Sequence, residues 1–304
     1  MAIQTTLDAR MLASIASLTL ATTSDLVGRV VLILLELMLA RQVRRPETEL
    51  VERAARGGDR GPTRKGEAMP RLEKLADSLW LADGDIVDFH GFPYPTRSAV
   101  VRLADDRIWV WSPIKLDGEL RTEIDAVGRV AHLVSPNKLH HLHLAEWRAA
   151  YPTAKLWGPR STIKRFPALA FAGALGDVAP ADWGPDIDQA WFRGSFMMDE
   201  VVFFHRPTRT AMFADLIQAF DDAFLRRHWS WWRRPLARLG GISAANPGAP
   251  SDWRSSFLNR RAARAARAKV LGWPCERAIV AHGEWPRTGG RDFIKRALSW
   301  LGPE

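Results

Sequence analysis

Apolar residues follow two spacings along this chain after residue 71, and the spacing separates predicted strands from predicted helices. Short apolar runs at 98–103 and 108–113 flank the turn residues Ala104-Asp105-Asp106, a pattern typical of a β-hairpin. Residues 119–127 instead carry apolar side chains at helical spacing, with Asp117 as the expected N-cap and Gly128 as the stop. Strands and helices are therefore expected within one continuous stretch of chain.

The remaining patterned segments alternate between the same two kinds of element. Short apolar runs predict strands at 79–82, 130–134, 154–159, 189–192, 200–204, 210–214 and 278–281. Helical spacing predicts helices at 143–151, 215–228, 254–271 and 291–301. Each half of the patterned region runs from strands into alternating helices and strands, which predicts an α/β fold. We expect a four-layer αββα sandwich.

The first 70 residues have a different pattern. Residues 26–40 are largely apolar but include Arg29 and Glu36, so the uninterrupted run is far shorter than the roughly 20 residues of a spanning helix. We expect residues 1–52 to form an amphipathic helical extension able to touch a membrane surface, and residues 53–70 to form a disordered linker. The alternative, which we favour, is that translation begins at Met69. The folded domain is expected to span residues 71–304.

The cysteine count and the net charge limit which kinds of site and partner this chain can have. The chain of 304 residues has a formal net charge of +9 and one cysteine, Cys275, which excludes an internal disulfide framework and a multi-cysteine metal site. A single cysteine also fits a reducing compartment, so we expect a cytoplasmic protein. The basic balance would suit a nucleic-acid partner, but no nucleic-acid motif accompanies it, so this is the weaker interpretation.

Residues of metal-ligand type follow three of the predicted strands. His140 and His141 come after the run at 130–134, Asp215 ends the run at 210–214, and His282 follows the run at 278–281. Imidazole and carboxylate groups suit zinc or iron, and strand ends are stiff enough to hold them in place. Asn137 is expected to cap the segment after it or to orient a ligand, and Asp199-Glu200 is a weaker candidate pair.

At these positions the chain resembles the metallo-β-lactamase superfamily, and within it an uncharacterised branch classed as a domain of unknown function. The likeness spans residues 72–302 and is carried by Trp109-Val110-Trp111-Ser112-Pro113-Ile114, His132-Leu133-Val134-Ser135-Pro136-Asn137-Lys138-Leu139-His140-His141, Val201-Val202-Phe203-Phe204 with Ala214-Asp215-Leu216-Ile217, and Val280-Ala281-His282-Gly283. The resemblance implies an αββα fold with a metal site at the edge of the β-sandwich.

The chain departs from the metal motifs of that superfamily. With Ser135 as the Thr of the pattern Thr-His-x-His-x-Asp-His, the two leading histidines become Pro136 and Lys138. The middle histidine of the superfamily falls on Ser195. In the superfamily these three histidines hold one of two metals, so the resemblance implies that one metal site is lost.

The positions for the other metal all keep residues able to bind one: His140, His141, Asp215 and His282. The resemblance therefore implies one divalent ion, zinc first, with iron or manganese as alternatives. His143 would replace His140 if the register slips. Lys138 would place its ammonium where the lost metal stood and stabilise a developing oxyanion.

These residues support three functional hypotheses. The leading one is a metal-dependent hydrolase acting on a small-molecule ester, thioester, lactone or phosphate ester, with Asp215 and Lys138 as catalytic residues. The first alternative is a catalytically inactive relative that serves as a binding or scaffold protein, which the three lost ligands favour. The second alternative is nucleic-acid binding through an arginine stripe and a Trp/Arg-rich loop, at Arg260, Arg261, Arg264, Arg267 and residues 226–234.

Overall fold

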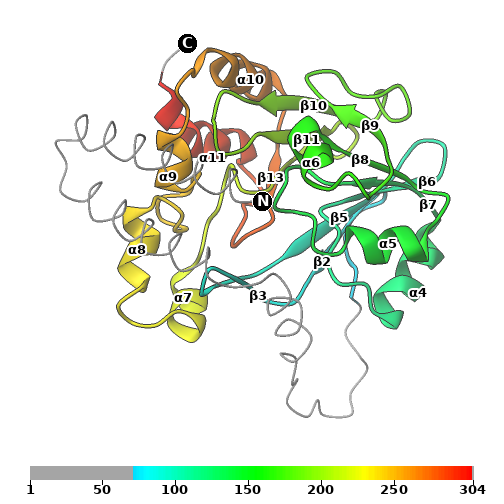
Figure 1. Cartoon of the computed structure of the whole chain (residues 1–304), viewed down its shortest axis with the longest axis horizontal. Coiled ribbons are helices and arrows are strands. Elements are labelled where there is room, and N and C mark those ends of the chain that lie inside the picture. The colour runs from blue at the N-terminus through cyan, green and yellow to red at the C-terminus, as the bar shows by residue number, and fades with distance from the viewer. Residues whose placement is uncertain (1–70, 303–304) are drawn as a thin grey trace, which may run out of the picture. The chain divides into compact units, whose positions relative to one another are not determined.

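The structure is a computed structural model that describes residues 71–302. Within this range the chain forms two large β-sheets and a small hairpin, with helices on the outer faces (Figure 1). The predicted extension (1–52) and linker (53–70) lie outside the described residues. Across 71–302 no helix combines the length and apolar character needed to cross a bilayer.

The first sheet has the strand order β1-β2-β5-β6-β7-β8-β9. Its strands are Glu73–Ala76 (β1), Leu79–Asp83 (β2), Arg97–Arg102 (β5), Arg107–Trp111 (β6), Arg129–Val134 (β7), Lys155–Pro159 (β8) and Phe171–Leu175 (β9). The pairs from β1 to β6 are antiparallel, and those from β6 to β9 are parallel. Parallel neighbours need long crossover connections. The connections contain the helices Gly118–Val127 (α4), Leu144–Ala150 (α5) and Arg160–Arg165 (α6).

The second sheet has the order β10-β11-β12-β13. Its strands are Ile187–Phe192 (β10), Glu200–His205 (β11), Thr210–Phe213 (β12) and Arg277–Val280 (β13). The pair β12 and β13 is parallel and the others are antiparallel. The long crossover from β12 to β13 holds the helices Asp222–His228 (α7), Arg234–Leu239 (α8), Ser251–Ser255 (α9) and Arg261–Gly272 (α10). After β13 come Gly290–Ala297 (α11) and a 3₁₀ turn at Ser299–Leu301. The small hairpin pairs Val87–Phe89 (β3) with Phe92–Tyr94 (β4).

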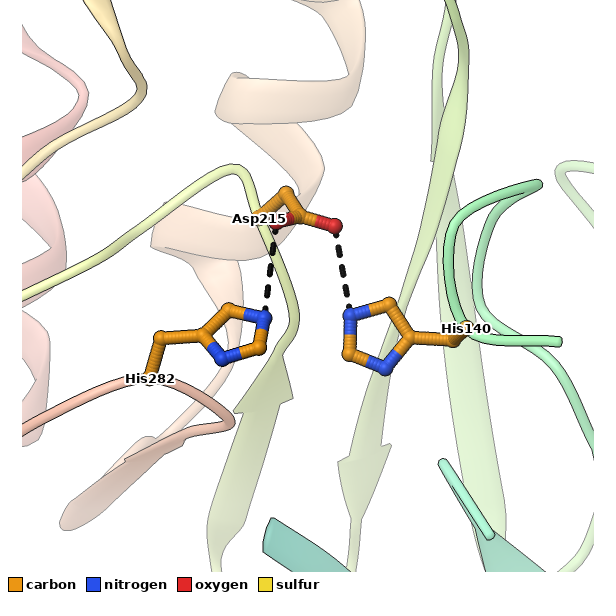
Figure 2. A group of neighbouring side chains, drawn as sticks. All are labelled: His140, Asp215 and His282. Carbon is orange, nitrogen blue, oxygen red and sulfur yellow. Dashed lines mark ion pairs between the residues drawn. The ribbon is translucent and has the colours of Figure 1, made fainter. Parts of the chain in front are cut away.

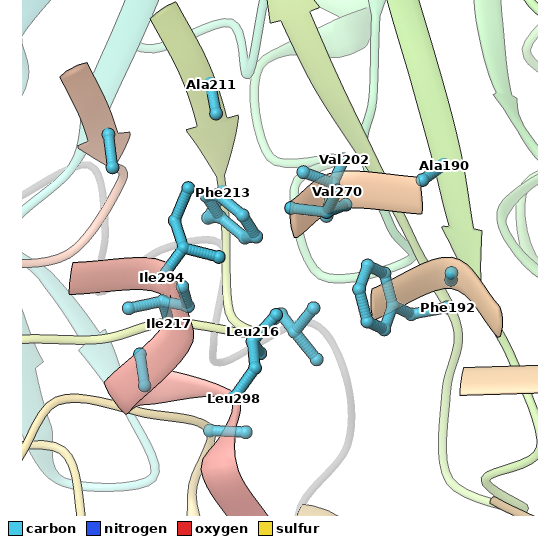
Figure 3. Packing of buried hydrophobic residues seen from close by; sticks show 14 of the residues in the cluster. Ala190, Phe192, Val202, Ala211, Phe213, Leu216, Ile217, Val270, Ile294 and Leu298 are labelled. Carbon is cyan, nitrogen blue, oxygen red and sulfur yellow. The ribbon is translucent and has the colours of Figure 1, made fainter. Parts of the chain in front are cut away.

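Side chains alternate along the buried strands, and this alternation creates the layers. Trp109 and Trp111 of β6 join Phe203 of β11 in an apolar cluster between the sheets. Ile108 and Val110, on the other face of β6, pack with residues of α4 and α5. The outer face of the second sheet packs against α10 and α11 in the same way, with Phe213 and Ile294 among the contacting residues (Figure 3). The predicted αββα sandwich is confirmed.

Several local predictions hold. Helix α4 begins at Gly118, where the Asp117 side chain accepts a hydrogen bond from the Leu120 N–H, and it ends at Gly128. The hairpin of β5 and β6 surrounds the predicted turn. These features depend on residues close together in sequence, which explains why the pattern alone predicts them.

The helix predicted at 215–228 is wrong in its first half. Only Asp222–His228 is helical, as α7. The N–H groups of Gln218, Ala219 and Phe220 donate instead to carbonyls of Gly248, His282 and Ile242. The apolar residues that suggested a helical face, such as Leu216 and Ile217, are buried because the segment runs through the core.

The helix predicted at 254–271 is also wrong, because the chain breaks it into α9 and α10. Between them Phe257 forms a bridge with Ser195. Gly194 lies beside this bridge with φ of +111°, and a Cβ on it would lie 2.1 Å from the Asn259 carbonyl oxygen. Only glycine permits that approach.

The buried layer between the two sheets should contribute strongly to the free energy of unfolding. Phe203 has no exposed surface, so we expect Phe203→Ala to lower the free energy of unfolding by about 3–5 kcal/mol in urea titrations. Leu258 is 82% exposed, and Leu258→Ala should change the same quantity by less than about 0.5 kcal/mol. Equal losses in the two variants would contradict the assigned layers.

Candidate metal centre

Three residues far apart in sequence converge at one edge of the sandwich: His140, Asp215 and His282. Asp215 follows β12 and His282 follows β13, and the parallel pairing of these strands brings both to the same end of the second sheet. His140 lies in the turn after β7 of the first sheet. Figure 2 shows the two imidazole rings next to each other, each directed at one oxygen of the carboxylate.

The distances among the three side chains are short. His140 Nε2 lies 3.2 Å from Asp215 Oδ2, and His282 Nε2 lies 3.5 Å from Asp215 Oδ1. One ligand atom from each residue lies within 4.8 Å of the others. Tetrahedral ligands at zinc bond lengths of roughly 2.0–2.2 Å stand about 3.3–3.6 Å apart. The two histidine–aspartate separations already match this spacing, and the separation between the two rings would have to close from at most 4.8 Å for one small divalent cation to bind.

Hydrogen bonds at the far nitrogen of each ring orient the two histidines. His282 Nδ1 lies 2.7 Å from the Pro95 carbonyl oxygen, which can only accept, so this nitrogen carries the hydrogen. Its Nε2 then faces Asp215, where it can donate a hydrogen bond to the carboxylate or give its lone pair to a cation. His140 Nδ1 lies 2.7 Å from Ser112 Oγ, and its Nε2 also faces Asp215. Such outer hydrogen bonds are what metal-binding histidines use to fix their tautomer.

Two side-chain amides hold the Asp215 carboxylate. Asn137 Nδ2 donates to Oδ2 at 2.9 Å, and Gln218 Nε2 donates to Oδ1 at 3.0 Å. The Asn137 Oδ1 atom accepts from the Leu139 N–H at 2.8 Å. Asn137 therefore does both of the things expected of it: it caps the turn that carries His140, and it orients a candidate ligand.

Glu200 supports the candidate centre by binding the backbone that carries Asp215. The sequence indicated this residue only as a weaker candidate. Its carboxylate has no exposed surface and accepts from the backbone N–H groups of Ala214, Asp215 and Leu216 at 2.8–3.1 Å. It also accepts from Asn137 Nδ2 at 2.9 Å. The available signal was an acidic residue at the first position of an otherwise apolar strand. Glu200 thus shapes the backbone that presents Asp215.

Burial and charge act in opposite directions on the two carboxylates. Burial raises the pKa of Asp215, but hydrogen bonds from His140 and His282 outweigh it and hold the pKa well below its usual range. For Glu200, burial and then the negative charge of Asp215 raise the pKa to about 8. Burial lowers the pKa of His140, against the opposing effect of Asp215. A cation bound between the rings would relieve the excess of negative charge.

The structure does not bring His141 into this group. Its ring stacks on Phe166 at a centroid distance of 4.1 Å, and its Nδ1 lies 3.0 Å from the Lys138 carbonyl oxygen. Adjacent residues in the turn point in different directions, so only His140 faces Asp215. His143 lies apart as well, in an ion pair with Glu146. The ligand set predicted from the sequence is therefore reduced from four residues to three.

Lys138 also lies apart from the three residues. Its ammonium donates to the Met197 carbonyl oxygen and lines a neighbouring cleft whose lining includes none of the three. Among residues 71–302, no hydrogen bond or ion pair joins its ammonium to Asp215 or to the two rings, and its predicted role in stabilising an oxyanion stays a prediction.

The arginine stripe of α10 is partly used inside the fold. Arg260 donates to the Trp300 carbonyl oxygen, and Arg264 donates to the Leu301 carbonyl oxygen, at 3.1 and 2.7 Å. These contacts fasten the end of the chain to α10. Two of the four arginines proposed for nucleic-acid contact therefore already make hydrogen bonds within the fold.

Comparisons with known proteins show which fold the chain has. No family profile matches the chain, and no curated protein matches it in sequence. Among solved structures, it is similar to the DIM-1 metallo-β-lactamase exposed to ceftazidime, with a TM-score of 0.51, 14% identity, and 76% and 95% of the two chains covered. A metallo-β-lactamase from Hirschia baltica gives a TM-score of 0.50 at 12% identity, covering 77% and 98%. Rubredoxin oxygen:oxidoreductase from Desulfovibrio gigas gives a TM-score of 0.50 at 14% identity, with 76% of this chain and 61% of that chain covered. These likenesses establish the fold and leave the activity open.

The buried Glu200 carboxylate should leave a signature in the pH dependence of stability. Because its pKa is raised from 4.5 to about 8, the folded state binds a proton more tightly than the unfolded chain between these pH values. Ionised Glu200 therefore costs stability as the pH rises through this window. In chelator-treated protein, the unfolding free energy of the wild type minus that of Glu200→Gln should fall from pH 5 to about pH 8.

The exposed Glu284 gives the matched control, since Glu284→Gln removes one negative charge near the site without touching the buried network. The unfolding free energy of the wild type minus that of Glu284→Gln should vary less with pH. A Glu200→Gln difference that is flat or rises over the same range would contradict the assigned burial of this carboxylate.

Proposed function

We propose that this chain, which has the metallo-β-lactamase fold, is a metal-dependent hydrolase that holds a single divalent cation with His140, Asp215 and His282. The observation that carries the proposal is the convergence of two imidazole Nε2 atoms on opposite oxygens of one buried carboxylate. Zinc suits two nitrogen donors and one oxygen, while two histidines and one carboxylate would also accept iron or manganese.

A single ion is supported by what surrounds the three residues. Within residues 71–302 they are the one group of three or more histidine, cysteine or acidic side chains close enough to share an ion. The positions that the superfamily uses for its other ion hold Pro136, Lys138 and Ser195. Ser195 Oγ is engaged with Ser256 Oγ at 2.6 Å. These residues offer no second set of nitrogen and carboxylate donors.

When bound, a divalent cation would supply the positive charge that lowers the pKa of water for hydrolysis near neutral pH. The chain's own groups prepare the site for it. Asn137 and Gln218 fix the plane of the Asp215 carboxylate, and Pro95 and Ser112 fix the two rings. The three side chains are only 7–9% exposed, which limits the site to a narrow opening and suits a small-molecule substrate.

One observation favours the alternative of an inactive binding or scaffold protein. Both oxygens of Asp215 already accept an amide N–H, so the carboxylate is satisfied without a cation. Such a network would persist in a fold relative that has lost its metal. Metal affinity separates the two functions directly.

The adjacent histidines offer an unusually well-matched test of metal binding. We expect the wild-type protein to bind about one equivalent of Zn²⁺ in calorimetric titration and elemental analysis. His140→Ala and His282→Ala each remove one of three ligands and should weaken binding about 100-fold or more. His141→Ala, one residue away, should bind as the wild type does. Binding lost in His141→Ala but kept in His140→Ala would overturn the ligand assignment.

A second measurement tests catalysis. Small esters, thioesters, lactones and phosphate esters should include a substrate whose hydrolysis stops in chelator and returns with added Zn²⁺, Fe²⁺ or Mn²⁺. Asp215→Asn keeps the size of the side chain but removes its charge, and should lower kcat/KM about 100-fold or more. Hydrolysis that survives both the chelator and Asp215→Asn would refute a metal-dependent mechanism at this centre.

A further inference from the structure

A basic cleft of about 530 Å³ lies beside the metal centre but does not include it. Its lining contains four basic residues, Lys138, Lys164, Arg165 and Arg193, and one acidic residue, Asp199. Pockets that enclose small molecules commonly have volumes of about 300–1,000 Å³. The cleft therefore has the size for a small ligand and an excess of positive charge.

The single acidic residue of the cleft offsets only part of this charge. Asp199 accepts hydrogen bonds from Ser161 Oγ and from the Trp191 indole N–H, which fix its carboxylate in place. Arg193 is paired with Asp177 and stacks over the Trp191 ring at 4.4 Å. Arg193 is thus held in place as part of the wall.

The three other cations form no ion pair with any residue in the 71–302 range. Lys164 and Arg165 are exposed in the last turn of α6, and Lys138 is half-buried with its ammonium on the Met197 carbonyl oxygen. Burial, and then the positive charge of Arg165, lower the pKa of Lys138, and the negative charge of Asp199 opposes them. Like charges gathered around one cleft repel one another, and an anion bound among them would remove that cost.

Apolar side chains also line this cleft. Phe196 is 58% exposed although it is a large aromatic side chain, and Met197 and Met198 line the cleft next to it. A ligand with an anionic group and an organic portion could therefore contact both kinds of surface. Lys and Arg side chains grouped in this way are the usual partners of phosphate oxygens.

We propose that this cleft binds a small phosphate monoester, with Lys164, Arg165 and Lys138 around the phosphate and Phe196 against the organic group. The proposal does not depend on the metal centre, since no metal ligand lines the cleft. A dianionic phosphate matches the surplus of cations better than a carboxylate monoanion does. The volume of about 530 Å³ matches a small molecule.

The experiment uses the full-length protein freed of metal by chelator, so that phosphate cannot bind a cation at the other site. Calorimetric titration with phenyl phosphate should give saturable binding that is tighter than that of inorganic phosphate or benzoate. The double variant Lys164→Gln with Arg165→Gln should weaken phenyl phosphate binding about tenfold or more, because two charge-assisted contacts are lost. Arg160→Gln neutralises an exposed residue of the same helix outside the cleft lining and should change the Kd by less than about twofold.

Phe196→Ala provides a separate check. It should weaken the binding of phenyl phosphate and leave the binding of inorganic phosphate unchanged. The proposal is overturned if the wild type shows no saturable binding, or if binding survives the double variant. It is also overturned if Arg160→Gln weakens binding as much as the double variant does. Tight binding of a single-stranded oligonucleotide, lost in the double variant while phenyl phosphate shows no binding, would assign the cleft to nucleic acid instead.

Discussion

Three successive backbone N–H groups at the end of β12 point at one buried carboxylate, that of Glu200. A buried N–H without a partner costs about 1–3 kcal/mol, so the backbone of residues 214–216 is held firmly in this one conformation. That conformation turns the chain out of the sheet and aims the Asp215 side chain at His140 and His282. The geometry of the candidate metal centre therefore depends on a residue that is not one of its three ligands.

Asn137 connects the two halves of this arrangement. Its amide nitrogen bridges Glu200 and Asp215 in the second sheet, while its amide oxygen caps the turn that follows β7 in the first sheet. The Pro136 carbonyl oxygen also accepts the Val201 N–H, which ties this turn to the start of β11. The turn presents His140 to the centre and directs His141 toward Phe166. Lys138 of the same turn lines the basic cleft, whose lining includes none of the three candidate ligands.

The layers and most strands could be predicted because alternating apolar residues report which faces are buried, and Asp117 and Gly128 mark the ends of α4 locally. Asp215 and His282 could be predicted from strand ends. The choice of His140 over His141 could not, since it follows from a turn fixed by Asn137. The role of Glu200 depends on contacts 14–16 and 63 residues away in sequence. The segment after Asp215 appears helical by its spacing, yet its N–H groups bond to distant loops.

A crystal structure of the zinc-loaded protein, with anomalous data collected on both sides of the zinc edge, tests the central claim most directly. The account predicts one strong anomalous peak bonded to His140 Nε2, His282 Nε2 and the Asp215 carboxylate, with His141 still stacked on Phe166. No peak between these three side chains would contradict it, and so would an ion held by His141 or a second ion beside Lys138.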